Sequence, residues 1–310
     1  MRTVLVSGGA GYVGSHAVDW LLHRGYDVVV IDDLSLGHRE AVPPGVLLEG
    51  DIGDGAIVGR IVRERRIDGV LHFAASCSVG ESVTDPRKYV EQNVLKAAQF
   101  VHALLDGGVR HFVFSSTCAT YGVPLEATIS EEHPQNPINP YGETKLFIER
   151  MLGHYDRAYG FRSVLLRYFN AAGAAESGQL GESHDPETHL IPLALKTARG
   201  QRAAVVVYGS DYPTSDGTCI RDYVHVTDLA EAHLLALEQL WNGGASDAFN
   251  LGTGRGYSVR EIIQAAERVT GRTIATSMES RRPGDPPVLV ADASRAMNLL
   301  GWSPRRSGID

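Results

Sequence analysis

Two side chains four positions apart, Tyr141 and Lys145, have the types and spacing for acid–base chemistry. On a helix, residues at this spacing lie on one face, one turn apart. The lysine ammonium then lowers the pKa of the phenol below its free value of about 10, and a general base works best when its pKa lies near neutral pH. The pair therefore predicts a tyrosine general base, although the same spacing also occurs by chance on amphipathic helices.

A glycine-rich loop near the N-terminus predicts a dinucleotide site. Residues 3–7 read as a short strand, Gly8, Gly11 and Gly14 follow, and a helical pattern begins near Gly14. The first glycine allows a tight turn, the second lets backbone approach a pyrophosphate, and the third lets the helix pack on the strand. The helix N-terminus adds free N–H groups and a positive dipole end. The spacing is G-x-x-G-x-x-G rather than the commoner G-x-G-x-x-G.

The acid that ends the second strand indicates which dinucleotide binds. Residues 27–31 read as this strand, and Asp32 lies 18 positions after Gly14. A carboxylate here accepts hydrogen bonds from ribose hydroxyls and repels a 2′-phosphate. Asp33 adds a second negative charge, so the sequence favours NAD over NADP. A solvated turn is the alternative interpretation of the two aspartates.

Strands and helices alternate through the first half of the chain. Strands are expected at 46–50, 69–75 and 110–117, and helices at 56–65, 86–106 and 141–159. This alternation predicts an α/β fold, a Rossmann-type doubly wound parallel sheet. The apolar run at 69–75 indicates a strand buried on both faces, so His72 within it reads as a core histidine. Asn93, in the helix at 86–106, is expected to bond either backbone or cofactor, with a structural role favoured.

The carboxyl ends of parallel strands face the ligand crevice of such a sheet. Asp51 and Ile52 follow the third strand, where an adenine edge is expected. Small residues at Ala74 and Ala75 admit a cofactor to the end of the fourth strand. Thr117 ends the fifth strand and is the candidate partner of a substrate hydroxyl, although threonine is also common near strand ends for its β propensity.

The second half predicts a smaller α/β substrate-binding lobe. Helices are expected at 190–199, 226–240 and 258–270, and strands at 205–208 and 248–252. We expect an NAD-binding domain at 1–170, joined by segments around 224–251, and a mainly nucleotide-sugar-binding lobe at 171–310. The loop at 211–217 superficially looks like a calcium loop, but it lacks alternating oxygen ligands and a closing glutamate. No metal site is therefore expected.

Composition and charge exclude several classes of protein. The 310 residues are 43% hydrophobic and 21% charged, which is ordinary for a globular protein. A net charge of −8 argues against nucleic-acid binding. No apolar run approaches the roughly 20 residues of a membrane span, and the immediate first strand leaves no signal peptide. Cys77, Cys118 and Cys219 are widely spaced and suit a reducing cytoplasm.

Longer stretches resemble the UDP-glucose 4-epimerase family, within the extended short-chain dehydrogenase/reductase superfamily. The similarity runs nearly end to end, and its last stretch is specific to that family. The matching stretches are residues 8–16, 72–75, 79–83, 167–170 and 216–226.

The resemblance implies a cytoplasmic, homodimeric isomerase that holds NAD and interconverts UDP-glucose and UDP-galactose. Tyr141, as phenolate, would take the proton of the sugar 4-hydroxyl while hydride passes to the nicotinamide. The 4-keto sugar would then turn over within the site and take the hydride back on its other face. Thr117 would bond the 4-hydroxyl, and Lys145 would bind the nicotinamide ribose. The helices at 86–106 and 141–159 would form the dimer interface.

The resemblance also implies the remaining contacts. Arg221 and Arg282 would grip the diphosphate, Asp285 would accept from the uridine ribose, and Tyr208 would stack on uracil. The implied NAD site comprises Gly8, Gly11, Tyr12, Val13, Gly14, Asp32, Asp33, Leu34, Ser35, Gly37, Asp51, Ile52, Phe73, Ala74, Ala75, Asn93, Thr117, Tyr141, Lys145 and Phe169. The implied UDP-sugar site comprises Thr117, Tyr141, Asn170, His189, Leu190, Tyr208, Arg221, Arg282, Asp285 and Leu289.

Some positions depart from the family pattern. Cys77 lies where some members place a cofactor-contacting lysine, and Gln92 lies where many have a second asparagine, so altered cofactor retention is expected. Leu289 lies where a bulky tyrosine would exclude an N-acetyl group, so some turnover of UDP-N-acetylhexosamines is expected. Epimerisation of UDP-pentoses stays open.

Two other functions were weighed. A nucleotide-sugar 4,6-dehydratase would by resemblance need Asp-Glu after Thr117, where this chain has Cys118 and Ala119. A non-catalytic NAD-sensing protein would keep the glycine loop and lose Tyr141 or Lys145, and both are present.

Overall fold

The computed structural model describes residues 1–282 and 285–310. A seven-stranded sheet forms its centre, in the spatial order β3-β2-β1-β4-β5-β6-β10. Every neighbouring pair is parallel, and the chain reverses its direction of growth between β1 and β4. The predicted Rossmann-type sheet is confirmed. Its strands are β1 (Thr3–Ser7), β2 (Asp27–Asp32), β3 (Leu47–Glu49), β4 (Gly69–His72), β5 (His111–Thr117), β6 (Arg162–Tyr168) and β10 (Asp247–Leu251).

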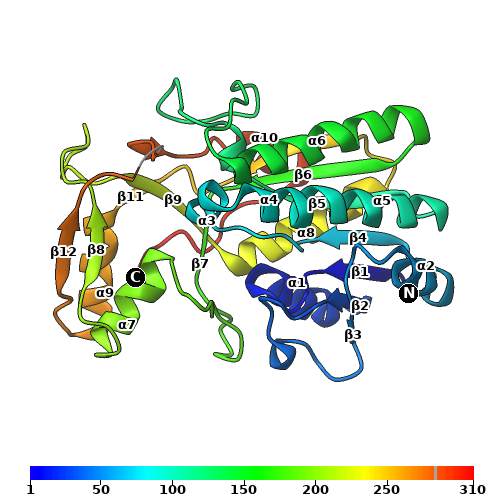
Figure 1. Cartoon of the computed structure of the whole chain (residues 1–310), viewed down its shortest axis with the longest axis horizontal. Helices are drawn as coiled ribbons and strands as arrows, with labels where there is room; N and C mark the ends of the chain where they lie inside the picture. The colour runs from blue at the N-terminus through cyan, green and yellow to red at the C-terminus, as the bar shows by residue number, and fades with distance from the viewer. Residues whose placement is uncertain (283–284) are drawn as a thin grey trace.

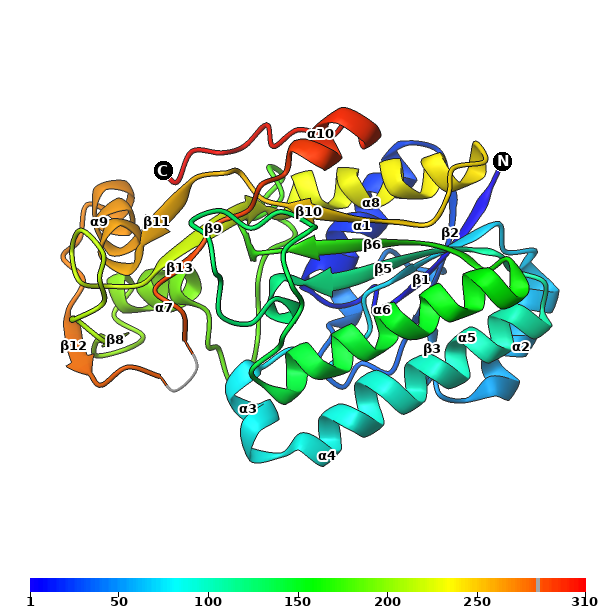
Figure 2. The same cartoon turned by 90° about the horizontal axis from the view of Figure 1, so that it is seen from above.

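Helices cover both faces of the sheet (Figure 2). One face carries α1 (Tyr12–His23), α8 (Val226–Trp241) and α10 (Ser294–Leu300), and the other carries α2 (Gly55–Arg65), α5 (Lys96–Asp106) and α6 (Pro140–Tyr159). The strands are therefore apolar on both sides: Val4, Leu5 and Val6 are all fully buried. None of the described helices is long and apolar enough to cross a membrane.

The helix expected at 86–106 is present with these bounds, but it is not α-helical throughout. It begins as α4 (Pro86–Tyr89), widens into a π-helical stretch, η2 (Val90–Leu95), and continues as α5; a short helix, α3 (Val79–Thr84), precedes it. Asp85 separates α3 from α4, because its side chain accepts from the Lys88 N–H and Pro86 follows at the first helical position. Such π segments often lie at functional sites, and Asn93 lies inside this one.

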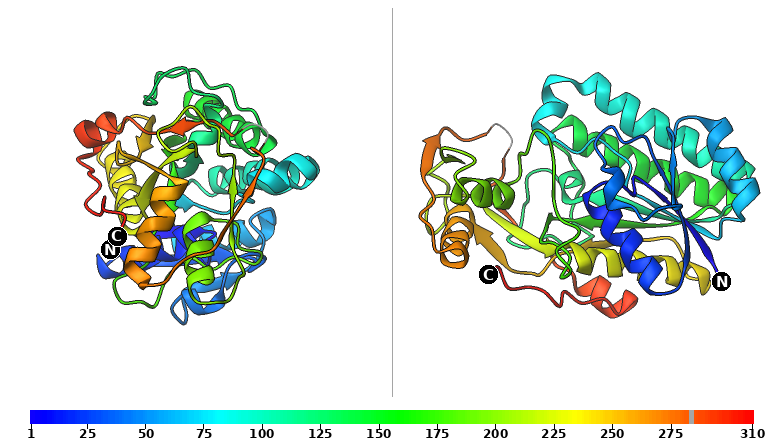
Figure 3. Two further views of the ribbon diagram at one scale, coloured as in Figure 1. Left: turned by 90° about the vertical axis from the view of Figure 1, so that its left-hand side faces the viewer. Right: turned by 90° about the horizontal axis from the view of Figure 1, so that it is seen from below.

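The smaller lobe lies at the opposite end of the molecule from the N-terminus (Figures 1 and 3). Its outer part packs α7 (Leu190–Ala198) and α9 (Val259–Thr270) against β8 (Val205–Tyr208) and β12 (Thr276–Glu279). Its inner sheet comprises β7 (Asn170–Ala172), β9 (Ile220–His225), β11 (Gly256–Ser258) and β13 (Val288–Leu289). Ser258 and Glu261 form a capping box at the start of α9. Short 3₁₀ turns η1 (Arg39–Ala41) and η3 (Cys118–Thr120) complete the description.

Candidate active site

The glycine loop joins β1 to α1, and two of its glycines are required by geometry. Gly8 has φ +73°, and a Cβ there would come within 2.5 Å of the Ala74 nitrogen. A Cβ on Gly14 would meet the Gly8 carbonyl oxygen at 2.1 Å. Gly11 is the N-cap of α1, and a Cβ on it would meet only the Gly8 oxygen, at 3.4 Å. The loop thus presents bare backbone and a helix N-terminus, as a pyrophosphate site requires.

The two acids after β2 shape the adjoining loop. Asp32 is buried, and its two carboxylate oxygens accept from the N–H groups of Ala10 and Leu34, both at 2.9 Å. Burial raises the pKa of this carboxyl, and the two backbone hydrogen bonds oppose the rise. Asp33 accepts from the Ser35 N–H at 3.0 Å. These acids hold the loop in a position where it can line one side of an adenosine site.

A pocket lies between the glycine loop and the carboxyl ends of β2, β3 and β4. It contains most residues predicted to contact NAD. Its lining consists of Gly8, Gly11, Ile31, Asp32, Asp33, Ser35, Leu36, Gly37, Gly50, Asp51, Ile52, Phe73, Ala74, Ala75, Ser76, Gln92 and Lys96.

Four predicted contacts lie beside this pocket rather than in its lining. The Tyr12 hydroxyl donates to the Gly173 carbonyl at 2.6 Å and so links α1 to the chain after β7. Val13 packs against the core under α1, and Gly14 follows it in the helix. Leu34 has a positive φ of 57°, so it makes the bend that follows Asp32.

Lys96, the first residue of α5, was missed by the sequence analysis. Its ammonium lies 2.7 Å from the Asp51 carboxylate and 3.9 Å from the Asp33 carboxylate, so it partly neutralises two acids in the pocket. The signal was available, because Lys96 lies three residues after Asn93 and therefore on the same helix face.

Two other predicted residues have structural roles. His72 is buried among Phe100 and Phe114, and its Nδ1 lies 2.6 Å from the Ser7 hydroxyl. Burial lowers its pKa to about 3, with Lys145 adding to the effect, so the prediction of a neutral core histidine is confirmed. The Asn93 amide accepts from the N–H of Ser76 at 2.8 Å and donates to its carbonyl at 3.0 Å. Asn93 therefore fixes the chain after β4.

The predicted catalytic residues meet at the carboxyl end of β5. Asn139 caps α6 by accepting from the Gly142 N–H at 2.9 Å, which fixes Tyr141 in the first turn. Lys145 lies one turn further on, buried, and its Nζ donates to the Ser115 carbonyl at 2.8 Å. Thr117, the last residue of β5, lies beside Tyr141, and its hydroxyl accepts from the Ala119 N–H at 3.1 Å.

The electrostatics of this group differ from the prediction in one respect. Burial raises the pKa of Tyr141 well above its ordinary value of 10.0, and the neighbouring Tyr168 and Cys77 raise it further, with only Thr117 opposing the rise. Burial also lowers the pKa of Lys145 to about 8. The expected lowering of the phenol's pKa by Lys145 is therefore not found, because desolvation of the phenol is the largest effect on this pKa. A positive charge brought close to Tyr141 is needed to make it a base.

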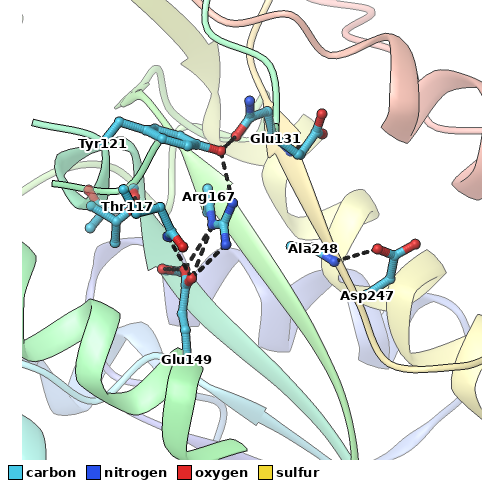
Figure 4. Close-up of polar contacts among 11 residues, drawn as sticks. Thr117, Tyr121, Glu131, Glu149, Arg167, Asp247 and Ala248 are labelled. Atoms are coloured by element: carbon cyan, nitrogen blue, oxygen red, sulfur yellow. Dashed lines mark hydrogen bonds and ion pairs between the residues drawn. The ribbon is translucent and has the colours of Figure 1, made fainter. Parts of the chain in front are cut away.

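A buried polar network anchors α6 to the sheet (Figure 4). The Glu149 carboxylate forms a bidentate ion pair with the Arg167 guanidinium of β6, at 2.7 and 3.0 Å. It also accepts from the Ser116 hydroxyl at 2.5 Å and from the Gln135 amide at 2.9 Å. Arg167 donates further to the Tyr121 hydroxyl at 3.0 Å. This network locks the helix that carries Tyr141 and Lys145 against β5 and β6.

The predicted nucleotide-binding residues gather in the smaller lobe and contact one another. The Arg221 guanidinium, on β9, pairs with the Asp285 carboxylate and donates to the Ile220 carbonyl at 2.7 Å. The Arg282 guanidinium lies over the Tyr208 ring at 4.0 Å from its centroid. Each arginine expected to bind the diphosphate is thus paired with another predicted nucleotide contact: Arg221 with Asp285, and Arg282 with Tyr208.

The remaining predicted substrate residues lie along the border between the smaller lobe and the main sheet. Asn170 begins β7, and His189 precedes Leu190 at the start of α7. Phe169 is buried in a small cluster with Cys118, and Leu289 of β13 packs against that cluster. Leu289 therefore lies near the chain that directly follows Thr117.

Known proteins match this architecture over almost its whole length. A model of the NAD dependent epimerase/dehydratase family matches residues 4–252. The chain belongs to this family. It is 48% identical to a UDP-glucose 4-epimerase of Halalkalibacterium halodurans, over 99% of this chain and 92% of that protein. It is 50% identical to a UDP-glucose 4-epimerase of Rhizobium leguminosarum bv. trifolii, over 98% and 93%.

Solved structures of other family members superpose closely. The UDP-glucose 4-epimerase of Brucella ovis in complex with NAD has a TM-score of 0.97 at 52% identity, covering 100% of this chain and 95% of that one. The UDP-glucose 4-epimerase of Bifidobacterium longum in complex with NAD⁺ and UDP has a TM-score of 0.94 at 40% identity, covering 100% and 95%. The family fold thus accounts for the sheet and for the smaller lobe.

Proposed function

We propose that this protein is an NAD-dependent UDP-glucose 4-epimerase, interconverting UDP-glucose and UDP-galactose. The observation that carries the proposal is that Tyr141 lies beside Thr117, with Lys145 one turn away, at the same sheet edge as the glycine-loop pocket. NAD fits this pocket, because Gly8 and Gly11 present bare backbone to it and Asp32 and Asp33 disfavour a 2′-phosphate.

The chain's own residues handle the proton. NAD, when bound, supplies a reversible acceptor for the hydride of the sugar C4. Thr117 orients the 4-hydroxyl, and Tyr141 takes its proton as the C4–H bond breaks and returns it when that bond forms again. Tyr141 needs positive charge close by to ionise, since burial holds its pKa high. Lys145 alone does not lower this pKa, so the positive charge would come from oxidised NAD when it is bound.

The smaller lobe holds the UDP group. Arg221 and Arg282 are placed for the diphosphate, and a guanidinium grips phosphate through two hydrogen bonds. Asp285 would leave Arg221 for the uridine ribose when the nucleotide enters, and Tyr208 would offer its ring to uracil. We divide the protein into an NAD-binding unit at 1–170, completed by 224–251, and a lobe formed mainly by 171–310.

One experiment tests the chemistry directly. The purified protein is incubated with UDP-galactose without added NAD, and UDP-glucose is followed. Formation of UDP-glucose supports both the epimerase activity and a retained cofactor. Y141F should lose this activity while still retaining NAD, and Y159F, an exposed tyrosine on the same helix, is the matched control. An active Y141F protein would refute the role of Tyr141.

We further propose a homodimer formed through α5 and α6, which lie side by side on one outer face (Figure 2). Leu95, Phe147 and Tyr159 expose 53%, 53% and 59% of their surface there, and such apolar exposure indicates an interface. F147E should convert a dimer to a monomer in light scattering; a monomeric wild type would refute the proposal.

We also propose a cytoplasmic location. The described cysteines are free, which fits this location, and cell fractionation tests it.

A further inference from the structure

The loop between β7 and α7 gathers four potential metal ligands. Glu182, His184, Glu187 and His189 each offer one donor atom, and these atoms all lie within 4.8 Å of one another. His184 Nδ1 lies 3.4 Å from a Glu182 oxygen and 3.8 Å from a Glu187 oxygen. His189 Nδ1 lies 2.5 Å from the Glu182 oxygen and 3.5 Å from the Glu187 oxygen.

These spacings fit a tetrahedral ion. Zinc binds imidazole nitrogen and carboxylate oxygen at about 2.0–2.2 Å. The edges of such a tetrahedron are about 3.3–3.6 Å long. Three of the four distances between an imidazole nitrogen and a carboxylate oxygen lie close to this length. The fourth, between His189 and Glu182, is a hydrogen bond that an ion would replace. Two imidazoles with two carboxylates are also a donor set that zinc-like ions prefer.

Two polar atoms of the cluster are otherwise unexplained. The Glu187 and Glu182 side chains expose only 3% and 8% of their surface. His184 Nδ1 and Glu187 Oε2 are buried and have no hydrogen-bond partner among the described residues. Buried polar groups without partners are costly. A proton shared by His189 and Glu182 satisfies only that pair, whereas a divalent cation satisfies both imidazoles and balances both carboxylates.

We propose that Glu182, His184, Glu187 and His189 form a binding site for one divalent transition-metal ion of the zinc class. Binding replaces the proton between His189 and Glu182, so a proton is released. The ion would also fix this loop against the start of α1, because the His184 ring packs edge-on against Tyr12, with 6.4 Å between ring centroids. Tyr12 belongs to the glycine loop, so the site adjoins the cofactor site.

The ion should inhibit the enzyme. His189 cannot contact the substrate while it ligates a metal, so inhibition should be relieved by UDP-sugar. This effect rests on the proposed role of His189 in the UDP-sugar site. Metal binding itself does not rest on that role, and it is measured without substrate.

The probe is Co²⁺ added to the NAD-loaded protein. We expect one Co²⁺ per chain and the intense visible absorption of a tetrahedral site. H184Q and E187Q should each weaken binding at least tenfold. H23Q is the control, because His23 is exposed and pairs with Asp19 on the surface of α1. Co²⁺ binding to the metal-free site should release a proton, measured by calorimetry in buffers of different ionisation enthalpy, and Zn²⁺ should then displace the bound Co²⁺.

Circular dichroism and retained NAD establish that each variant is folded. Binding with the weak spectrum of an octahedral, largely hydrated ion would overturn the proposal. Equal affinity of wild type and H184Q, with H184Q folded, would also overturn it. Failure of the activity assay alone would leave this binding result intact, so the two proposals fail separately.

Discussion

The buried pair of Glu149 and Arg167 gives a prediction with an internal asymmetry. Their side chains expose 3% and 7% of their surface. E149Q leaves the Arg167 charge buried with Tyr121 as a neutral partner, and removing one member of a buried pair costs about 3–5 kcal/mol. At roughly 2 °C per kcal/mol for a chain of this size, we expect the unfolding midpoint to fall by about 6–10 °C.

R167M should behave differently, because the group left behind can discharge. Arginine stays protonated at all accessible pH values, whereas an unpaired Glu149 can take up a proton. A buried carboxylate without a cation is costly and its protonation removes that cost, so the destabilisation is small at low pH and grows as pH rises. Glu149 also keeps its donors Ser116 and Gln135. We expect R167M to approach wild type at pH 5 and to fall below it at pH 8.

Thermal unfolding of the NAD-loaded protein at both pH values measures this. The double variant E149Q/R167M should cost less than the sum of the single variants, since neither charge remains. E91Q, which removes an exposed pair with Arg87 on the helix surface, is the control and should not move the midpoint. The reasoning is refuted if E149Q and E91Q have equal midpoints, or if R167M loses the same stability at both pH values.

Three further predictions concern the pocket and the site. K96M leaves Asp33 and Asp51 unneutralised, so retained NAD should fall several-fold, as for the loss of about 1 kcal/mol; unchanged NAD content after gel filtration would contradict this. Burial lowers the folded-state pKa of Lys145 from 10.5 to about 8, so wild-type stability should rise relative to K145M as pH increases from 8 to 10. The same pH dependence of the urea unfolding midpoint in both proteins would contradict this. L289Y should abolish turnover of UDP-N-acetylglucosamine and spare UDP-glucose; equal loss of both substrates would show that Leu289 does not select at the sugar C2.

The strands and the glycine loop could be predicted because local pattern decides them. The apolar run Val4–Val6 indicates a buried strand, and the spacing of Gly8, Gly11 and Gly14 indicates the loop that follows it. The π-helical stretch at Val90–Leu95 could not be predicted, and neither could the contact of its Asn93 with Ser76, because the contact joins segments that are distant along the chain. Contacts between distant segments are likewise hidden from sequence periodicity.

The site shows the same division. Tyr141 and Lys145 could be found from their spacing, but the direction of the Tyr141 pKa could not, because burial decides it. The four proposed ligands in the loop before α7 have no recognisable metal spacing in the sequence. Only the folded loop brings Glu182 within 2.5 Å of His189.

The last strand of the main sheet has a consequence for synthesis on the ribosome. β10 (Asp247–Leu251) pairs with β6, and α8 covers α1 and the same face of the sheet. A nascent chain that has emerged only as far as residue 170 therefore exposes the open edge of β6 and the apolar surface of α1. Unpaired edges and bare apolar faces attract other chains. The dinucleotide-binding half therefore cannot complete its sheet until about eighty more residues have been translated, and until then its exposed surfaces are at risk of misassembly.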